Sequence, residues 1–194
     1  MLKRLFDIFL SSIGIVGSFP LWLLFSLAIK LGDGGPVFYT QERVGKQGKP
    51  FWTIKFRSMV PDAEKQTGAV WASENDPRVT KVGKLLRATA MDELPQLLNI
   101  FKGDMSFVGP RAERPELVEQ FSKKIKNYHN RFFVAPGLTG LAQVYGNYDT
   151  PPHQKLRYDL LYIKNYSFLF DMKLIFLSFW ITFRGKWESR AKKF

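Results

Sequence analysis

The chain has 194 residues, of which 45% are hydrophobic and 24% charged, so it is neither a disordered segment nor a low-complexity linker. It carries 29 Lys and Arg against 17 Asp and Glu. The resulting net charge of +12 predicts an anionic partner: nucleic acid, a phosphorylated small molecule or an anionic membrane. Cysteine is absent and histidine occurs twice, which excludes disulfides, thiolate nucleophiles and Cys-ligated metals. A bound metal must therefore use oxygen ligands.

The N-terminal region contains a long apolar segment. Residues 8–29 carry no charge and could cross a hydrocarbon core of ~30 Å as a helix, and they are too many for a cleaved signal peptide. Pro20 predicts a kink near the middle, because proline lacks the helical N–H and clashes with the preceding turn. One interpretation is a kinked helix that spans the membrane once. The other is a helix that turns back, which the basic residues at both ends (Lys3, Arg4 and Lys30) mildly favour.

The central region has the character of a soluble domain. A turn cluster at 32–36 closes the apolar segment, and β-branched and aromatic residues then predict a hairpin with strands at 37–41 and 51–56. The polar stretch 61–80 predicts an irregular loop. Apolar residues at helical spacing predict a helix over 113–128, and a further helix is expected over 154–164.

A second apolar segment lies near the C-terminus. Residues 168–183 include Asp171 and Lys173, and the uncharged remainder is too short to span a membrane. Trp180 and Trp187, followed by a basic tail, are typical of an interfacial helix on anionic lipid. A buried core helix with a solvated tail explains the pattern equally well. The cations of the tail are Arg184, Lys186, Arg190, Lys192 and Lys193.

An acidic pair, Asp92 and Glu93, stands at the start of the sequence DELPQLLN. Pro95 predicts that a helix begins near Asp92, since proline is tolerated in a first turn. A positive helix end stabilises both carboxylates and a bound phosphate, and adjacent carboxylates can divide nucleophilic attack, metal binding and proton transfer between them. Acidic residues at helix starts are more often caps, so a purely structural role stays open.

The sequence KGDMSFVGPR at 102–111 follows directly. Its glycines let the backbone approach a ligand closely, and the planar fork of Arg111 suits a phosphate group. Asp104 could add an oxygen ligand for Mg²⁺. Alternatively, this is a pair of tight loops in which Asp104 and Arg111 bind each other.

Three segments together point to a known family. They are ERVGKQGKPFWTIKFRSM (42–59), RATAMDELPQLLNIFKGDMSFVGPR (87–111) and PGLTGLAQVYG (136–146). They resemble the bacterial monotopic phosphoglycosyl transferases, the polyprenyl-phosphate sugar-1-phosphate transferases of glycoconjugate biosynthesis. The resemblance extends from the N-terminal apolar segment to about Phe183, and the long ordered middle block makes it specific.

The resemblance implies an α+β, mainly helical fold. It implies a re-entrant membrane helix over residues 1–31 and a cytoplasmic, membrane-associated catalytic domain over 32–194, with interfacial amphipathic helices and a small helix-associated β-hairpin. The implied activity is an enzymatic ping-pong transfer of a phosphosugar from a UDP-sugar to undecaprenyl phosphate, with release of UMP. This is the first membrane step of glycoconjugate synthesis, at the cytoplasmic face of the bacterial inner membrane. The expected partners are these substrates and anionic membrane lipid, not nucleic acid; the sugar and the oligomeric state are not predicted.

The resemblance also implies roles for individual residues. Asp92 matches the nucleophile that carries the phosphosugar, and Glu93 matches its partner. Mg²⁺ is the implied cofactor, for which Asp92 and Asp104 are the expected ligands. Within the matching positions, the residues expected to bind substrate are Lys55, Arg57, Arg87, Arg111, Gln143 and Asp159.

The chain departs from the family pattern at three places. Phe19 stands where the family usually has a serine before the kink proline, and Ser18 comes one residue earlier. The usual motif GPRP is GPRA here, with Ala112 in place of the second proline. After Gly146, Asn147 and Tyr148 stand where many members of the family have an arginine. These changes affect the membrane helix, the rigidity of one loop and one contact to the nucleotide or sugar.

Three other classes of protein remain possible from the residues alone. A nucleic-acid-binding module fits the charge but explains neither the apolar N-terminus nor the acidic pair. A membrane-anchored scaffold fits the apolar ends, and a metal-dependent phosphatase would share the oxygen ligands without needing a lipid acceptor. Release of UMP from a UDP-sugar distinguishes the transferase from all three.

Overall fold

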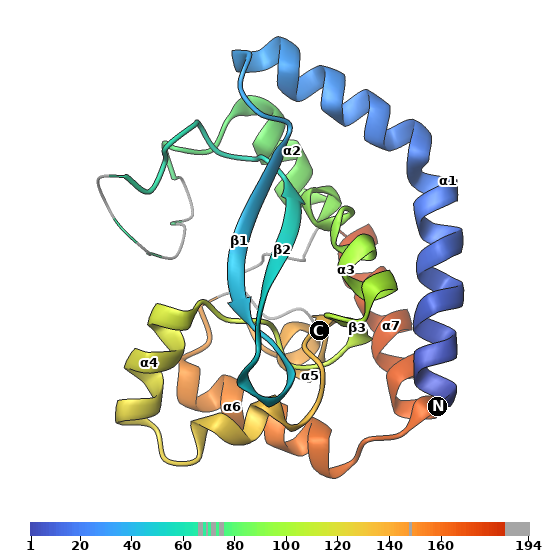
Figure 1. Cartoon of the computed structure of the whole chain (residues 1–194), viewed down its shortest axis with the longest axis vertical. Coiled ribbons are helices and arrows are strands. Elements are labelled where there is room, and N and C mark those ends of the chain that lie inside the picture. Colours follow the sequence, from blue (N-terminus) through green and yellow to red (C-terminus); the bar gives the residue numbers. More distant parts are fainter. Residues whose placement is uncertain (66–67, 69, 71–72, 74–75, 148, 185–194) are drawn as a thin grey trace.

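The computed structural model is mainly helical with two small two-stranded sheets, which confirms the α+β, mainly helical prediction (Figure 1). It describes residues 1–65, 68, 70, 73, 76–147 and 149–184. The helices are α1 (Leu2–Asp33), α2 (Lys81–Ala88), α3 (Gln96–Lys102), α4 (Pro115–Lys124), α5 (Leu141–Tyr145), α6 (Pro152–Lys164) and α7 (Phe168–Phe183). Tyr148, Trp187 and the tail cations Lys186, Arg190, Lys192 and Lys193 lie outside the described residues.

The predicted hairpin is confirmed and is longer than expected. Strand β1 (Phe38–Val44) pairs antiparallel with β2 (Pro50–Phe56), and a short 3-10 turn, η1 (Lys46–Gly48), joins them. A second sheet, which the sequence did not predict, pairs β3 (Ser106–Val108) in parallel with β4 (Gly137–Thr139). Strands of three residues carry too little periodicity to be recognised from sequence.

Two glycines allow the loops after β3 and before β4 to touch. A Cβ atom on Gly137 would lie 2.0 Å from the nitrogen of Gly109, and a Cβ on Gly109 would lie 2.2 Å from the carbonyl oxygen of Ala135. Side chains cannot occupy that space, so the backbones of the GPR and PGL motifs meet only with glycine at both positions. These glycines therefore serve the packing of the two loops against each other.

Helix α1 runs along one side of the molecule and bends along its length (Figure 1). Pro20 inside it leaves a carbonyl without its usual helical partner. The Ser18 hydroxyl donates to the Gly14 carbonyl at 2.6 Å and accepts from Trp22 Nε1 at 3.0 Å. These two hydrogen bonds link the helical turn before Pro20 to the turn that follows it.

Charged residues bind the N-terminal end of α1 to the rest of the chain. Lys3 Nζ lies 2.6 Å from a carboxylate oxygen of Asp171 on α7, and Arg4 donates to the last carbonyls of α3. The buried carboxylate of Asp7 accepts from the Ser106 hydroxyl at 3.1 Å. Lys3 and Arg4 therefore bind other parts of the chain, in addition to being the basic residues that precede the apolar segment.

The C-terminal end of α1 is bound in the same way. The guanidinium of Arg57, directly after β2, forms a two-pronged ion pair with Asp33, the last residue of α1. It also donates to the carbonyls of Pro36 and Met59. Both ends of α1 are thus held by the same compact body.

The sequence predicted that the acidic pair lies at the start of an α-helix, and the structure contradicts this. Asp92 and Glu93 lie in a separate 3-10 turn, η2 (Met91–Glu93), and α3 begins only at Gln96. Pro95 has no N–H to donate to the Met91 carbonyl, which accepts from Leu94 instead and keeps the turn in 3-10 form. Ala90, with φ 56°, redirects the chain immediately before the pair.

The predicted helix over 113–128 is shorter than expected, whereas the helix predicted over 154–164 is confirmed as α6. Helix α4 ends at Lys124, and the chain turns at Asn127, whose φ is 61°. A second 3-10 segment, η3 (Tyr128–Phe133), follows. Tyr128, the last residue of the predicted helix, belongs to this segment, where it is 2% exposed.

Two of the four clusters of buried apolar residues hold the helices that frame the structure. One joins β3 and helices α5 to α7 and contains Val108, Val144, Tyr162, Leu174 and Ile181, each less than 2% exposed. The other packs α1 onto the hairpin and α2 through Ile29, Phe56 and Leu86. Helix α1 therefore contacts the end of the hairpin at which Phe38 pairs with Phe56, through Trp22 and Phe25.

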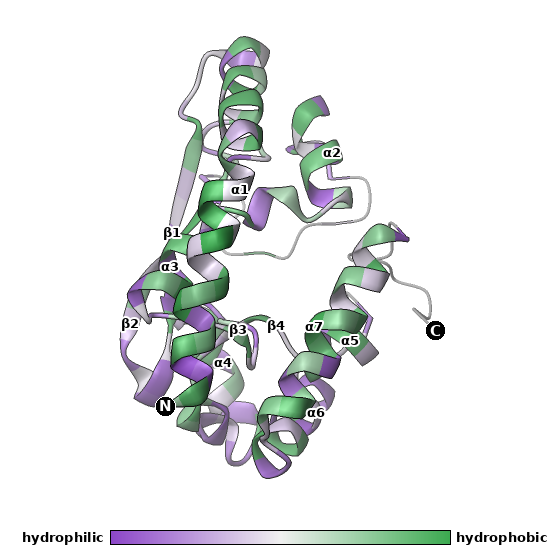
Figure 2. Ribbon diagram, turned by 90° about the vertical axis from the view of Figure 1, so that its right-hand side faces the viewer, coloured by the Kyte–Doolittle hydropathy of each residue, from purple (hydrophilic) through white to green (hydrophobic). Residues whose placement is uncertain are grey.

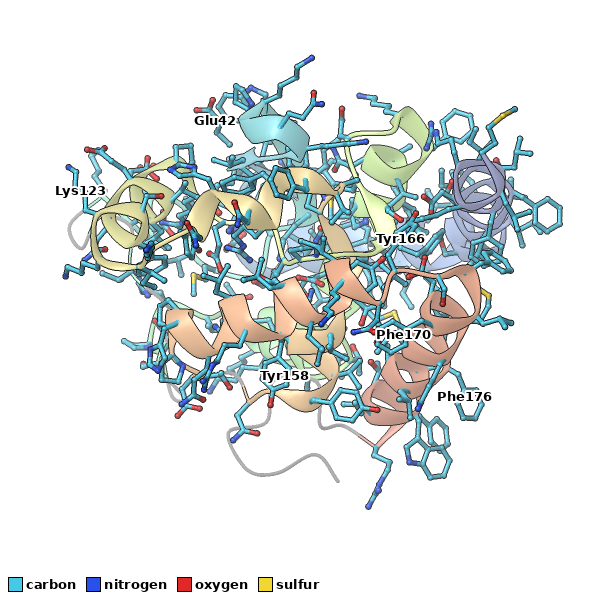
Figure 3. The ribbon with its side chains drawn as sticks, turned by 90° about the horizontal axis from the view of Figure 1, so that it is seen from below. Glu42, Lys123, Tyr158, Tyr166, Phe170 and Phe176 are labelled. Carbon is cyan, nitrogen blue, oxygen red and sulfur yellow. The ribbon has the colours of Figure 1, made fainter. Side chains whose placement is uncertain are left out.

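An extensive apolar surface remains on α1 and α7, as the hydropathy colouring shows (Figure 2). Helix α7 is buried on one side and exposed on the other, because Asp171 and Leu174 are buried while Phe176 projects away from the body (Figure 3). Its contact with anionic lipid stays a prediction. Helix α1 is long and apolar enough to cross a membrane. The exposed apolar residues are Leu2, Leu5, Phe9, Ile13, Val16, Phe19, Leu21, Leu23, Leu24, Leu27 and Leu31 of α1, and Leu169, Phe176, Phe179, Trp180 and Phe183 of α7.

Candidate active site

A cavity of about 790 Å³ lies between the hairpin, η2, the segment after β3, and helices α5 and α6. It brings together residues from β1, β2, α2, η2, α4, η3, α5 and α6, between Pro36 and Asp159 of the chain. Seven residues that the sequence analysis selected line it: Lys55, Arg57, Arg87, Asp92, Arg111, Gln143 and Asp159.

The two members of the acidic pair face different surroundings. Asp92 lines the cavity, with 8% of its surface exposed. Glu93 lies behind the cavity wall, where its Oε1 is 2.6 Å from Lys55 Nζ and 2.6 Å from Arg111 Nη2. Asp92 is therefore the carboxylate placed to meet a ligand, and Glu93 the one placed to hold two cations.

The ion pairs control the charge of Glu93. Burial alone would raise its pKa, but Arg111 and Lys55 outweigh burial and hold the pKa of Glu93 well below its usual range. Glu93 is therefore ionised at neutral pH and is a poor proton acceptor there. Its two cations, Lys55 and Arg111, line the same cavity as Asp92.

Arg57 has a structural role within the cavity wall. It is 5% exposed, and its donors are used by Asp33 and two backbone carbonyls. The same ion pair lowers the pKa of Asp33 to about 2. Although Arg57 lines the cavity, its contacts fix the junction of α1 and β1.

Asp104 is not brought to the cavity, in contrast to the prediction that it binds metal together with Asp92. The two residues lie beyond opposite ends of α3, whose seven residues span about 10 Å. Asp104 accepts a 3.3 Å hydrogen bond from Asn99, a residue that also binds the backbone of β2 on both sides of Thr53. Asp104 thus belongs to the packing of α3 on the hairpin.

Further charged residues of the cavity were missed by the sequence analysis. Burial, with Arg111 and Arg114 nearby, lowers the pKa of Arg43 to about 10, and burial also lowers the pKa of Lys155. Arg43 falls inside the first family-like segment, but the others lie outside all three segments and had no signal. The missed residues are Arg43, Asp62, Glu64, Lys65, Glu113, Arg114, Arg131 and Lys155.

The cavity offers Mg²⁺ a partial set of ligands. Within the described part of the chain, no three Asp, Glu or His side chains converge on one point. Mg²⁺ commonly binds through one or two carboxylates together with substrate phosphates and water. Asp92 at the cavity wall fits that arrangement, so the site suits an ion that arrives with a phosphorylated ligand.

Comparison with known proteins identifies the family. The profile of the bacterial sugar transferase family matches residues 1–185. The chain therefore belongs to this family, which confirms the resemblance drawn from its three motif segments and makes it a transferase by class.

Its relatives carry more specific names. A Bacillus subtilis (strain 168) protein, named provisionally as an undecaprenyl-phosphate N-acetylgalactosaminyl 1-phosphate transferase, is 52% identical over 67% of this chain and 72% of its own length. A UDP-glucose:undecaprenyl-phosphate glucose-1-phosphate transferase of Klebsiella pneumoniae is 43% identical over 95% of this chain, which spans 40% of that relative. A Rhizobium leguminosarum bv. phaseoli exopolysaccharide production protein, PSS, is 41% identical over 91% of this chain and 92% of its own length.

Proposed function

We propose that this chain transfers a phosphosugar from a UDP-sugar to undecaprenyl phosphate and releases UMP, with Asp92 as the nucleophile. One observation carries the proposal: Asp92 faces the cavity, whereas its neighbour Glu93 is bound by Lys55 and Arg111. The names of the relatives support the two substrates. The sugar differs among these relatives, so it is left open here.

The reaction proceeds in two half-reactions at one site. An oxygen of the Asp92 carboxylate attacks the phosphorus that carries the sugar, and the bond from this phosphorus to the UMP oxygen breaks. UMP leaves with the electron pair, and an acyl phosphate joins Asp92 to the sugar. A phosphate oxygen of the lipid then attacks the same phosphorus, which releases the Asp92 carboxylate unchanged.

The cations beside Asp92 make this attack possible. A carboxylate approaching a diphosphate meets strong repulsion, and Lys55 and Arg111 lie where they offset it. Because Glu93 already holds both cations in place, they need not reorganise when charge develops on the transferring group. Asp92 would hold Mg²⁺, which would supply additional charge neutralisation.

The catalytic body sits at one face of the bacterial inner membrane, the cytoplasmic face, and α1 is re-entrant. Contacts support this, because Lys3 and Asp33 at opposite ends of α1 both bind the body that holds the cavity. Between the ends, one side of α1 packs on that body through Leu97 and Phe56. A spanning α1 would draw these packed elements into the hydrocarbon, where their polar backbone loops are costly.

The membrane orientation of α1 is testable because the chain lacks cysteine. Cysteine replaces Leu2 and Gly32, two exposed positions near the ends of α1, and Phe19 near its bend. We expect an impermeant thiol reagent to label Leu2→Cys and Gly32→Cys only after the inner membrane is permeabilised, and Phe19→Cys in neither case. Labelling of one end in intact cells, with the other protected, would show a spanning helix.

The activity itself is tested with the purified full chain, Mg²⁺, undecaprenyl phosphate and a panel of UDP-sugars. We expect UMP release with at least one sugar, and at most about one UMP per chain without lipid, provided that the acyl phosphate resists water. A phosphatase would instead release phosphate or sugar phosphate without lipid. A scaffold protein would release nothing.

A further inference from the structure

Two guanidinium groups hold the peptide backbone at Arg111. Arg131 Nη2 donates to the carbonyl of Arg111 at 2.9 Å, and Arg43 Nη1 donates to the carbonyl of Ala112 at 3.0 Å. This segment after β3 has no helix or strand of its own. The position of the Arg111 side chain at Glu93 therefore depends on contacts from distant parts of the chain.

Arg131 is itself fixed by Tyr128, in its own segment η3, and by Asp159 on α6. Its Nη2 lies 2.9 Å from Asp159 Oδ2 on α6, and its Nη1 donates to the Tyr128 hydroxyl at 2.5 Å. Its guanidinium also lies over the Tyr128 ring, 5.0 Å from the centroid. Arg131 and Asp159 are 3% and 2% exposed, so neither moves into solvent.

The Asp159 carboxylate is therefore directed at Arg131. Burial raises the pKa of Asp159 to about 6, and Arg131 opposes that rise. A buried ion pair contributes little net stability over apolar residues of the same volume. Its distinctive effect is to fix where the guanidinium lies.

We propose that Asp159 and Arg131 are positioning residues for the transfer: Asp159 orients Arg131, Arg131 fixes the Arg111 carbonyl, and this sets where the Arg111 fork meets the substrate phosphate. The inference rests on the proposed function and assigns Asp159 a different role from the substrate contact expected from sequence. Asp159 acts on the transferring group through two other residues.

The decisive variant is Arg131→Lys. Lysine keeps a positive charge beside Asp159, but one ammonium cannot replace the fork that reaches Asp159, Tyr128 and the Arg111 carbonyl together. We expect kcat for UMP release to fall about 10- to 100-fold, as small misplacements of catalytic groups do. The thermal unfolding midpoint, measured in the same detergent, reports whether the variant is folded.

A double-mutant cycle separates positioning from general damage. In an Arg111→Gln background, Arg131→Lys should lower kcat for UMP release less than about 2-fold, because the guanidinium that Arg131 positions is already absent. Lys55→Gln is the matched control, since Lys55 binds the same Glu93 carboxylate from β2 and takes no part in the contacts of Arg131 described above. In that background the full loss from Arg131→Lys should persist.

Two further variants keep the test independent of one substitution. Tyr128→Phe removes the hydroxyl bonded to Arg131 and retains the ring and the ion pair. It should therefore lower kcat less than Arg131→Lys does, and that fall in kcat should also disappear in the Arg111→Gln background. Asp159→Asn should also lose its effect in the Arg111→Gln background. If it keeps that effect there, Asp159 contacts substrate directly and the inference is wrong.

The outcomes are distinguishable from failure of the proposed function. If wild type releases no UMP from any UDP-sugar, the function is wrong, and the same cycle measured on UDP affinity by calorimetry still tests the coupling of Arg131 to Arg111. If wild type is active and the losses from Arg131→Lys and Arg111→Gln simply multiply, the positioning role is overturned.

Discussion

Replacing Asp92 by asparagine should reduce UMP release roughly 10³-fold or more, because the amide has no anionic oxygen with which to attack phosphorus. Asparagine is nearly the same size, and Asp92 is 8% exposed, so the fold should be retained. Circular dichroism and the thermal unfolding midpoint check the fold, and UMP release with and without undecaprenyl phosphate checks the activity. Retention of normal activity would make Asp92 a structural residue of η2.

The covalent step has its own measurement. Wild type incubated with its UDP-sugar and Mg²⁺, but no lipid, should gain the mass of one phosphosugar, with the adduct mapped to Asp92. Asp92→Asn should gain none. Asp104→Asn is the matched control, because it is the same substitution beyond the other end of α3 and outside the cavity. It should keep most of the activity and form the adduct.

Absence of any adduct in wild type, together with UMP release only when both substrates are present, would replace the two-step mechanism by direct transfer in a ternary complex.

Removal of divalent metal should abolish turnover, and Mg²⁺ should restore it. Within the described residues the cavity presents no cluster of three carboxylate or imidazole ligands, so most coordination positions must be filled by phosphate and water. We therefore expect weak Mg²⁺ binding to the free protein and much tighter binding once UDP is present. Calorimetric titration of Mg²⁺ with and without UDP measures the difference.

Two results would contradict this prediction. Full turnover in excess chelator would show that the cations of the cavity suffice alone. Tight Mg²⁺ binding without nucleotide would reveal further protein ligands, and the Asp92→Asn variant would show whether Asp92 is among them.

Local patterns in the sequence were sufficient for several elements. The hairpin was predicted because strand-forming residues flank a glycine-containing loop, and the bend of α1 because Pro20 removes a helical N–H. The acidic pair was recognised from the residue types themselves. The predicted helix start at the pair was wrong, because the missing N–H of Pro95 separates η2 from α3. General preferences for residues at helix starts do not include this detail.

The roles of the charged residues depended on the tertiary structure. Asp92 and Glu93 are neighbours in sequence and chemically alike, but only packing turns one to the cavity and the other to Lys55 and Arg111. From sequence, Asp104 was expected to bind metal together with Asp92, but α3 separates it from the cavity.

The sequence by itself determined the family, the apolar N-terminal helix and the residue types of the site, because these are encoded in composition, periodicity and ordered motifs. Only the tertiary structure decided which charges meet. Arg131 and Asp159 are 28 positions apart and nothing in their local sequence shows that they meet, yet they form a buried ion pair that supports Arg111. Coulomb energy and desolvation depend on distance and burial in three dimensions, and neither is a property of spacing along the chain.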